Sequence, residues 1–371
     1  MRIQTILAWM AMIVLVSGCN QQNAADKEAA LDVPEWLTNE EEKLPSDQPR
    51  RGAESENSDR DIRQAVLSDN HSDLREPRGE LKLHLQPGVQ FPLKKSVVTT
   101  LLQTASDGTE QRVQTELGLL MVIRVEEVVA GRTRLGVRYN RVEFEQSMDG
   151  QKLVYRSDNP PVVIPVAAQA YHDMVNDGFS FWIGKDNQIS ELVGFHGFLE
   201  RCLVHVPPAQ QKQVLLSMEA STDENGISDF VDNTIGLLPS GQDVAPGQEW
   251  VRHRSVGRPI PMVVQCKYTL QELTEAEAVV RITGEIIPSQ TIHKVLHNTD
   301  KDDINVTVLG GSTSGMCTIF RDTGLPKDSY TERVVNMTVN LGDGHTFDQK
   351  KTVQTHVEAF PPVRQPERSG E

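Results

Sequence analysis

The stretch Arg134-Leu-Gly-Val-Arg-Tyr-Asn-Arg-Val-Glu-Phe144 decides the fold class, because apolar and polar residues alternate along most of it. A period of two places the apolar side chains on one face of an extended strand. Similar runs, alternating or rich in β-branched residues, lie at 111–128 and 152–156. The pairs Asp107-Gly108 and Asp149-Gly150 punctuate these runs, and such pairs favour tight hairpins. The sequence therefore predicts an antiparallel meander.

Strand patterns continue on both sides of a central region with helical spacing. The further strand runs are 81–85, 97–103, 248–255, 262–273, 277–288, 304–309, 315–321, 328–340 and 350–359. Between the two series, residues 166–239 give mixed signals, with helical spacing on both sides of an expected hairpin at 179–183 and 189–195. We expect a mainly β (α+β) fold of curved antiparallel meander sheets with a few central helices, within a β-rich domain at 80–360. Residues 361–371 are expected to form a disordered tail, because Pro361-Pro362 cannot continue a central strand.

Two passages of the domain look alike. Pro87-Gly88 opens the first strand series and Pro246-Gly247 opens the second, with an offset of 159 residues. Farther along, the segment around Val125 resembles that around Leu270 with an offset of 145, so an insertion is required. One interpretation is a duplication with halves at 80–165 and 240–360. The alternative is that any two amphipathic hairpins look alike.

The N-terminus predicts export and lipid anchoring. Met1-Arg2 is followed by an apolar stretch, Ile3 to Val16, which is short for a membrane-spanning helix and typical of a signal peptide at 1–18. It ends Leu15-Val16-Ser17-Gly18-Cys19, which resembles the bacterial lipobox. That resemblance implies cleavage before Cys19 and attachment of acyl chains such as palmitate, which anchor the protein without spanning the membrane. The alternative is an ordinary signal peptide or short anchor with a chance cysteine.

The location within the envelope follows from the next residue. Position 20 is Asn rather than the Asp that marks inner-membrane retention in proteobacterial lipoproteins, so we expect the outer membrane rather than the inner one. Residues 20–79 hold fifteen acidic and eight basic residues, a net charge of −7 out of −15 for the chain. With Cys19 they are expected to form a lipidated, disordered acidic tether at 19–79. The acidic balance argues against nucleic acid as a partner.

The chain resembles an uncharacterised domain-of-unknown-function family of planctomycete-type bacterial lipoproteins over residues 80–360. The resemblance is carried by the lipobox and acidic tether, and by weakly specific motifs: Pro87-Gly88, Leu-Val-Gly-Phe195, Pro246-Gly247-Gln-Glu-Trp250 and Tyr268-Thr-Leu. It implies a β-rich exported lipoprotein and supplies no activity or catalytic residues.

Three cysteines remain for the domain. Cys266 and Cys317 lie in expected strands of the second half, and an exported compartment permits a disulfide between them. The alternative is that Cys202, Cys266 and Cys317 are all buried thiols that pack as small apolar residues.

Two short motifs contain residue types that occur in catalytic sites. His293 and His297 would share one face of a helix, with Asp300, Asp302 and Asp303 nearby, but a zincin Glu and an obvious third ligand are missing. A solvated loop is the preferred interpretation. Leu-Gly-Gly-Ser-Thr-Ser-Gly, at 309–315, does not match a hydrolase elbow and is expected to be a flexible turn.

These observations favour a non-enzymatic binding or scaffold protein of the cell envelope, with an envelope protein as partner. The first alternative is a carrier of a lipid or other apolar ligand, suggested by apolar faces such as Leu119-Leu-Met-Val-Ile123. The second is an envelope hydrolase or metal enzyme that uses His293 and His297. No catalytic residue, metal site or cofactor is expected.

Overall fold

Long antiparallel strands dominate the computed structural model, which describes residues 78–211, 214, 231, 234–239, 243–256, 262–294, 303–341 and 344–364. All of these residues belong to one compact unit. The strands in its first part are β1 (Gly79–Glu80), β2 (Val89–Ala105), β3 (Glu110–Val129), β4 (Arg132–Met148), β5 (Gln151–Arg156), β6 (Gly178–Ile183) and β7 (Ile189–Val193). Its second part contains β8 (Asp243–Val244), β9 (Glu249–Val256), β10 (Met262–Leu273), β11 (Glu277–Ile287), β12 (Ser289–Lys294), β13 (Asp303–Phe320), β14 (Pro326–Leu341), β15 (Thr346–Ala359) and β16 (Val363–Arg364).

The Asp149-Gly150 turn between two early strands forms where the sequence predicts it. Asp149 and Gly150 both have positive φ, 48° and 79°, and join β4 to β5 in a two-residue hairpin. Ala130 and Gly131 do the same between β3 and β4, with φ of 50° and 80°. Two consecutive left-handed residues match the right-handed twist of the flanking strands, so the strands pair without splaying. The predicted fold class, mainly β with antiparallel meander sheets, is confirmed.

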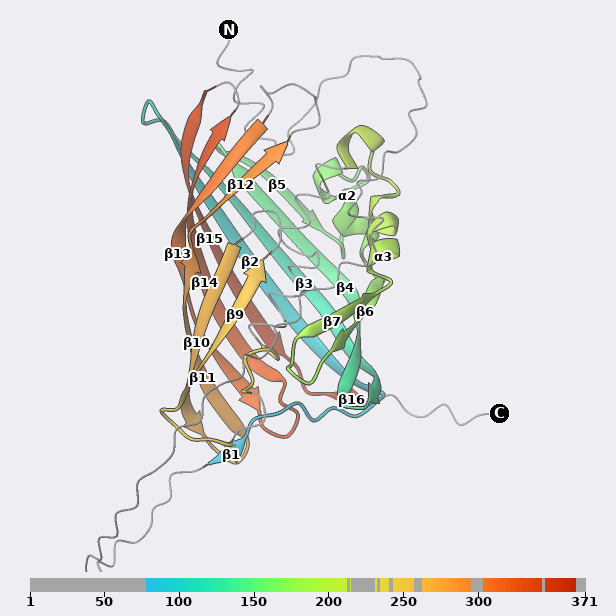
Figure 1. Ribbon diagram of the computed structural model, residues 1–371. Coiled ribbons are helices and arrows are strands. Elements are labelled where there is room, and N and C mark those ends of the chain that lie inside the picture. Colours follow the sequence, from blue (N-terminus) through green and yellow to red (C-terminus); the bar gives the residue numbers. More distant parts are fainter. Residues whose placement is uncertain are drawn as a thin grey trace, which may run out of the picture. The chain divides into compact units, whose positions relative to one another are not determined.

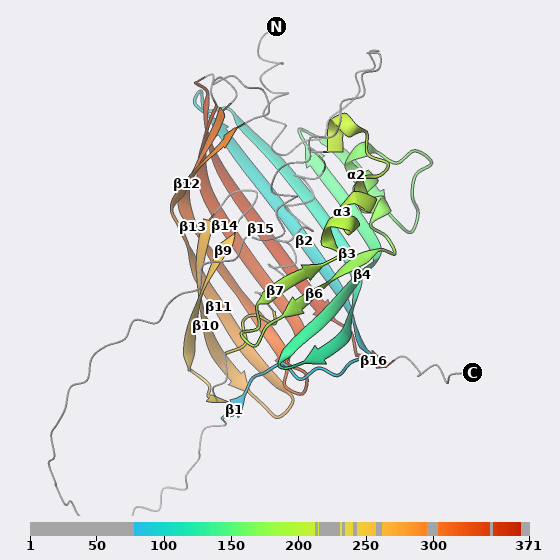
Figure 2. The ribbon, with the colours of Figure 1, turned by 45° about the vertical axis from the view of Figure 1, so that its right-hand side comes forward.

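The strands form one large sheet and one small one. The large sheet has 14 strands, with the main order β7-β6-β4-β3-β2-β15-β14-β13-β11-β10-β9. Strands β5, β12 and β16 pair with β4, β13 and β2, while β1 and β8 form a separate two-stranded sheet. Figures 1 and 2 show the large sheet strongly curved, with edge strands β7 and β9. The two sequence halves therefore share one continuous sheet, joined where β2 pairs with β15.

Five strands of each half pair in the same register. We call β2, β3, β4, β6 and β7 the first repeat, and β9, β10, β11, β13 and β14 the second repeat. The pairs Phe91–Ile123, Ile123–Val137 and Leu135–Phe181 of the first repeat correspond to Trp250–Tyr268, Tyr268–Ile282 and Val280–Cys317 of the second. The pair Phe181–Leu192 corresponds to Cys317–Ser329.

Irregularities recur at the same places. A register shift lies between Val125 and Glu127 in the first repeat and between Leu270 and Glu272 in the second. A second shift lies between Trp182 and Ile183, and between Thr318 and Ile319. A bulge inserts one residue at a defined point of a ladder. Bulges at equivalent points are therefore stronger evidence that the two repeats correspond than amphipathic patterning alone.

The two Pro-Gly passages also have equivalent positions. Gly88 and Gly247 have φ of 83° and 85°. The N–H of Gly88 donates to the carbonyl of Val125 at 2.8 Å, and that of Gly247 donates to Leu270 at 2.7 Å. The first repeat includes β6 and β7, which form the hairpin expected at 179–183 and 189–195, so this repeat extends beyond residue 165 into the mixed central segment.

One face of the sheet carries the buried side chains, and we call it the inner face. On β2, for example, Phe91, Leu93, Val97 and Leu101 are buried, and they lie at alternating positions. Two helices, α2 (Val166–Asp173) and α3 (Phe195–Leu203), follow β5 and β7 in sequence. Their buried residues join the inner-face cluster of the first repeat.

A segment before β2 lies beside one end of the sheet (Figure 1). We call residues 79–86 the strap. It pairs with β8 through Gly79–Val244 and then places Leu81 in the apolar cluster of the second repeat and Leu85 against that of the first. The strap therefore links the inner faces of both repeats.

The C-terminal tail differs from its prediction. Val363 and Arg364 form β16 and pair with Gln90 and Val89 of β2. The prediction that all of residues 361–371 are disordered is therefore wrong at these two positions. Pairing between β15 and β2 stops at Leu93, so the first residues of β2 are left with free ladder positions that the returning chain occupies after the two prolines.

Candidate ligand-binding face

Aromatic rings fill the inner face of the first repeat. Tyr139 of β4 stacks on Phe198 of α3 with ring centroids 5.8 Å apart, and Phe144 of β4 stacks on Tyr171 of α2 at 4.9 Å. Phe179 of β6 lies 5.3 Å from Phe198. These residues are at most 6% exposed, so the protein's own helices cover this part of the face.

A polar cluster lies beside this aromatic packing. The hydroxyl of Tyr155 hydrogen-bonds to Nδ1 of His172 at 2.8 Å, and Nδ1 of His205 lies 3.1 Å from both carboxylate oxygens of Asp173. Burial, with a smaller contribution from Asp173, raises the pKa of Tyr155 to about 12. The phenol therefore stays protonated at neutral pH, and the arrangement positions α2 against β5.

An ion pair fixes α3. Arg201 donates from Nε and Nη2 to the two carboxylate oxygens of Asp177, at 2.6 and 2.9 Å. These bonds are the main cause that lowers the pKa of Asp177, and the backbone N–H of Gly178 adds to them. The fork geometry attaches the helix to the residue immediately before β6.

The inner face of the second repeat has a different lining. Its cluster is mostly aliphatic along β11, β13 and β14, and includes Val280, Ile282, Val306, Val308, Val335, Met337 and Val339. At three matched positions the side chains are smaller here, because Cys317 replaces Phe181, Ser329 replaces Leu192 and Val280 replaces Leu135. At three other matched positions they are larger, because Trp250 replaces Phe91, Tyr268 replaces Ile123 and Ile282 replaces Val137. Of the described helices, α2 and α3 make their main contacts with each other and with β4 and β6.

The edge of this repeat is held by two side chains of β9. Trp250 stacks on Tyr268 with centroids 5.9 Å apart and donates from Nε1 to the carbonyl of Leu237 at 2.8 Å. Arg252 donates to the carbonyl of Leu238 at 2.6 Å and to that of Asp186, in the β6–β7 turn, at 2.9 Å. The side chain of Arg252 thus links edge strand β9 to the turn that precedes the other edge strand, β7.

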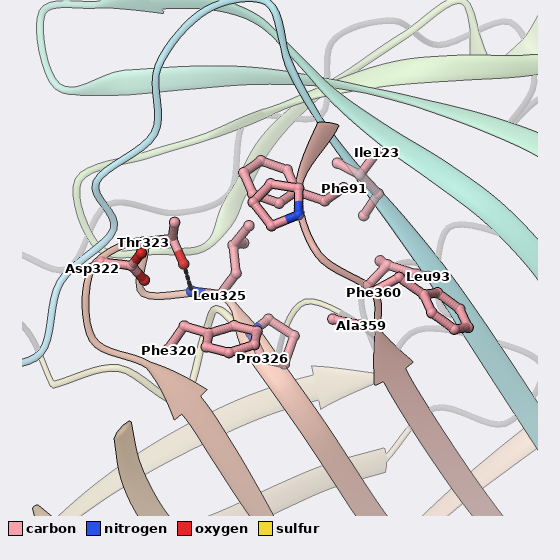
Figure 3. Close-up of a pocket in the computed structure, with 11 residues that line it drawn as sticks. Phe91, Leu93, Ile123, Phe320, Asp322, Thr323, Leu325, Pro326, Ala359 and Phe360 are labelled. Carbon is pink, nitrogen blue, oxygen red and sulfur yellow. Dashed lines mark hydrogen bonds between the residues drawn. The ribbon is translucent and has the colours of Figure 1, made fainter. Parts of the chain in front are cut away.

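A small apolar cavity of about 100 Å³ lies near the strap (Figure 3). Its wall includes Phe91, Leu93 and Ile123 of the first repeat, and Phe320, Leu325 and Phe360 from the end of β13, the following turn and the end of β15. It is smaller than the roughly 300–1,000 Å³ of typical small-molecule pockets. Alone it accommodates only part of an apolar ligand.

The cysteines do not form the predicted disulfide. Cys266 and Cys317 are both buried free thiols, as is Cys202. Cys266 lies on β10 and Cys317 on β13, with β11 between them, and Cys317 is level with Leu270 through Val280. Two strand spacings and a four-residue offset separate their Cα atoms by roughly 16 Å, far beyond the reach of a disulfide. The prediction of a Cys266–Cys317 bridge is wrong for this structure.

Burial also makes two of these thiols unreactive. It raises the pKa of Cys202 to about 12, with smaller contributions from Asp177 and Asp173, and it raises the pKa of Cys317 to about 12. The thiolate is the nucleophilic form, so neither residue suits covalent catalysis near neutral pH.

The histidine motif does not lie on a helix in the described part of the chain. His293 lies in strand β12 and not in a helix, so its spacing to His297 does not place both rings on one helix face. Asp303 begins β13, while His297, Asp300, Asp302 and the predicted lipidation site Cys19 lie outside the described residues. Within the described ranges, no group of three or more His, Cys, Asp or Glu side chains is arranged to hold a metal ion.

The glycine- and serine-rich motif is a strand and not a flexible turn. Residues 309–315 lie inside β13, and Ser312, Ser314 and Gly315 pair with both β11 and β14. At Gly315 an added Cβ would collide with the carbonyl oxygen of Tyr330, so only glycine permits this close approach of the strands. Such glycines let a sheet bend sharply.

Comparison with known sequences identifies the family. The Family of unknown function (DUF6263) matches residues 130–326. The chain belongs to this family. The match runs from the end of β3 to the start of β14 and includes most of the second repeat. The curated proteins contain no match to the sequence.

Solved structures with related geometry are distant in sequence. A lipovitellin structure that concerns lipid–protein interactions has 12% identity and a TM-score of 0.43. The match covers 78% of this chain and 27% of the lipovitellin chain. An outer membrane channel from Pseudomonas putida F1 has 8% identity and a TM-score of 0.21, with 75% and 97% covered. OpdQ from Pseudomonas aeruginosa has 7% identity and a TM-score of 0.18, with 73% and 99% covered. The chain thus spans about a quarter of the lipovitellin chain, and none of these scores supports a functional comparison.

Helices of the described part give no membrane span, since none is both long and apolar enough to cross a bilayer.

Sequence reasoning missed the charged residues of the inner face. Lys95 is 4% exposed and shares the alternation of Phe91, Leu93 and Val97 on β2. Arg333 shares the alternation of Val335 and Met337 on β14. Each of these basic residues lies an even number of positions from buried apolar residues of the same strand. This spacing is a signal in the sequence that would have placed them on the buried face.

Proposed function

We propose that this protein is a non-enzymatic, membrane-anchored lipoprotein of the bacterial envelope whose domain binds a lipid acyl chain or a similar apolar ligand. The observation that carries the proposal is the lining of the second repeat. Its strands reproduce the ladder of the first repeat, but Cys317 stands where the first repeat has Phe181, and the inner face along β11, β13 and β14 is mostly aliphatic. A curved sheet with an apolar face must cover it, and a flexible acyl chain fits an aliphatic lining.

The anchor is the part of the proposal that rests on the sequence. Cys19 follows the apolar leader, and two or more acyl chains at that residue would hold the protein on a membrane, with the outer membrane favoured by Asn20. Labelling cells with a clickable palmitate analogue tests this. The label is expected on the wild type and absent from Cys19→Ser, whereas label retained on Cys19→Ser would contradict lipidation at this residue.

Ligand binding is tested by native mass spectrometry and lipid extraction of the full-length protein. An apolar adduct is expected on the wild type. Cys317→Phe and Ser329→Leu transfer residues of the first repeat to matched positions of the second, and each is expected to reduce occupancy about tenfold by filling the space. Leu309→Phe is the matched control, because Leu309 is 56% exposed.

The outcomes separate the two leading functions. A wild-type protein that carries no adduct and binds neither palmitate nor hexadecanol would overturn the carrier proposal and favour the scaffold alternative, in which the domain recruits an envelope protein. Occupancy that is unchanged in both variants would place the ligand elsewhere.

A further inference from the structure

The large sheet is open between its two edge strands, β7 and β9. Every successive pairing along its main order of eleven strands is antiparallel, so β7 and β9 run in the same direction. Figures 1 and 2 both show them as neighbouring ends of the curved sheet. The hydrogen bond from Nη1 of Arg252 on β9 to the carbonyl of Asp186, at 2.9 Å, brings the two ends within reach of one side chain. We call these two edges, Ile189–Val193 and Glu249–Val256, the seam.

Strands equivalent to these two edges are joined by a further strand elsewhere in the sheet. In the correspondence between the repeats, β7 is equivalent to β14, and β9 is equivalent to β2. Strand β15 lies between β14 and β2 and pairs antiparallel with both. In the first repeat, helix α3 follows β7, whereas in the second repeat β15 follows β14. The seam is therefore the position of one strand for which the described first repeat has a helix instead.

Individual residues of the seam have counterparts that pair with β15. Ser329 of β14 and Lys95 of β2 both pair with Val357 of β15. Their counterparts in the seam are Leu192 of β7 and Arg254 of β9. An extended chain with one residue between Leu192 and Arg254 would therefore match the register of both edges.

Backbone groups of β9 point into the seam. The N–H of Leu270 donates to the carbonyl of Gln248 at 3.0 Å, so every second residue from Gln248 onward directs its backbone groups at β10. Val251 and His253 lie at the intervening positions, and their N–H and C=O groups point away from β10. In the part of the chain that the structure describes, these groups have no backbone partner. Such an edge is a template for a further strand.

The first repeat shows how an equivalent edge is used. Pro92 of β2 is the counterpart of Val251, and its carbonyl accepts a hydrogen bond from the N–H of Phe360, directly after β15, at 2.9 Å. Val251 is 49% exposed. The group that holds the end of β15 on one edge is therefore accessible to another chain on the other.

From this geometry we infer that the seam binds an extended segment of a partner protein as an added β-strand, antiparallel to both edges. Main-chain hydrogen bonds to β7 and β9 supply the affinity, and side chains at alternate positions supply the specificity. The inward residues of β15 at the same level are Val357 and Ala359, so a segment with aliphatic residues at every second position fits. This interaction goes beyond the proposed apolar ligand and does not depend on it.

The seam also determines the kind of segment. A strand that already belongs to another sheet has at most one side available for pairing, whereas the seam pairs with both sides of its occupant. An edge strand of a second copy of this chain therefore does not fit. The occupant is a tail or loop of the partner that is extended when it binds.

The test uses a strand that fits the equivalent place. A synthetic peptide with the sequence of residues 346–360 reproduces β15, and its binding to the full-length protein is measured by fluorescence anisotropy. Saturable binding of one peptide per protein is expected. The control peptide has the same side chains but is N-methylated at His356, Glu358 and Phe360, whose amides face β2 in the protein. Because it lacks these donors, it is expected to bind about tenfold more weakly or worse.

Hydrogen exchange locates the bound peptide. At a peptide concentration of about ten times Kd, exchange is expected to slow about tenfold at β7 and at Val251 and His253 of β9. Amides of Trp250 and Arg252 already face β10 and should not change. Exchange of the protein's own β15 should also stay the same, because that strand keeps its place.

A variant pair separates the backbone of β9 from its side chains. His253→Pro removes an N–H that points into the seam and keeps the ladder donors to β10, so it is expected to weaken peptide binding about tenfold. His253→Ala keeps the N–H and is the matched control, with unchanged affinity. Thermal unfolding by circular dichroism verifies that both variants are folded, and the N-methylated peptide tests the same bonds on the unaltered protein.

Three outcomes would overturn the inference: no binding of the peptide, equal binding of its N-methylated form, or protection of only one edge. Faster exchange of β15 with the peptide would also contradict it, because the peptide would then replace β15. A dimer in light scattering that protects both edges and is not dissociated by the peptide would assign the seam to a second copy.

Discussion

The two repeats have the same strand ladder and different inner faces. Tyr139, Phe144 and Phe181 bring large rings to the first repeat, and α3 and α2 pack on the first two of them. The second repeat has Cys317 at the position of Phe181 and aliphatic residues over most of β13 and β14. Strand pairing tolerates this change because the ladder is made by backbone groups, whereas the inner face determines what covers it. Both faces are buried, the first under rings and helices and the second with a mostly aliphatic lining.

The largest expected difference between the repeats is at Phe181 and its counterpart. Both Phe181 and Cys317 are fully buried. Phe181→Ala is expected to lower the free energy of unfolding by about 3–5 kcal/mol, through lost transfer energy and a cavity. Cys317→Ala removes only a sulfur and is expected to cost about 1 kcal/mol. Urea unfolding of both variants measures the contrast, and equal losses would show that the two faces are packed alike.

The indole of Trp250 gives the second repeat a bond that the first repeat does not have, since its counterpart there is Phe91. Trp250→Phe keeps an aromatic ring on Tyr268 but leaves the carbonyl of Leu237 without this donor. A loss of about 1–3 kcal/mol is expected if water does not replace the bond. Hydrogen exchange of β9 amides should increase selectively, and unchanged protection there would show that Trp250 does not hold this edge.

The Pro-Gly turns test whether the repeats are equivalent at their starts. Gly88 and Gly247 have nearly the same φ, and an added Cβ at either would meet no atom within 4 Å. Alanine at either site would therefore be strained only through its left-handed backbone, at a cost of about 1–2 kcal/mol. Thermal unfolding of the two single variants should give equal losses of stability. A clear difference between these losses would show that the two turns are not equivalent.

The ion pair of Asp177 is the smallest difference, because the second repeat has Thr313 at the matching position. The pKa of Asp177 is lowered in the folded state, so its contribution is present above the unfolded pKa of about 3.9 and is lost as pH falls through the folded value. Both side chains are partly exposed, and about 1 kcal/mol or less is expected. Asp177→Asn should flatten this part of the stability profile between pH 5 and 2, measured by urea unfolding. A profile identical to that of the wild type would rule out this role.

Much of the fold was predictable because its signals are local. Alternation in 134–144, the Asp-Gly turns and the two Pro-Gly passages each act within a few residues. The disulfide prediction failed because two expected strands were assumed to be neighbours, whereas β11 separates them. The strand at Val363–Arg364 was missed because its partner, β2, lies more than 250 residues earlier.

The candidate site was less predictable than the fold. Alternation alone assigns Lys95 and Arg333 to the apolar face of their strands, but their sequence positions are 238 residues apart. Only the pairing of β15 with both β2 and β14 brings them onto one surface. The chemistry of the inner face is therefore a property of strand order.

The sequence by itself determined the strands, their hairpins and the parity that separates inner from outer residues, because backbone periodicity and turn conformation are set by neighbouring residues. It also predicted the exported, lipid-anchored N-terminus, which depends on a short linear motif. Only the tertiary structure decided that both halves share one sheet, that their bulges match, and that Arg333 of β14 and Thr99 of β2 lie in one row through Val353 of β15. These features depend on which distant strands pair, and that choice is made by burial of the whole face rather than by any single segment.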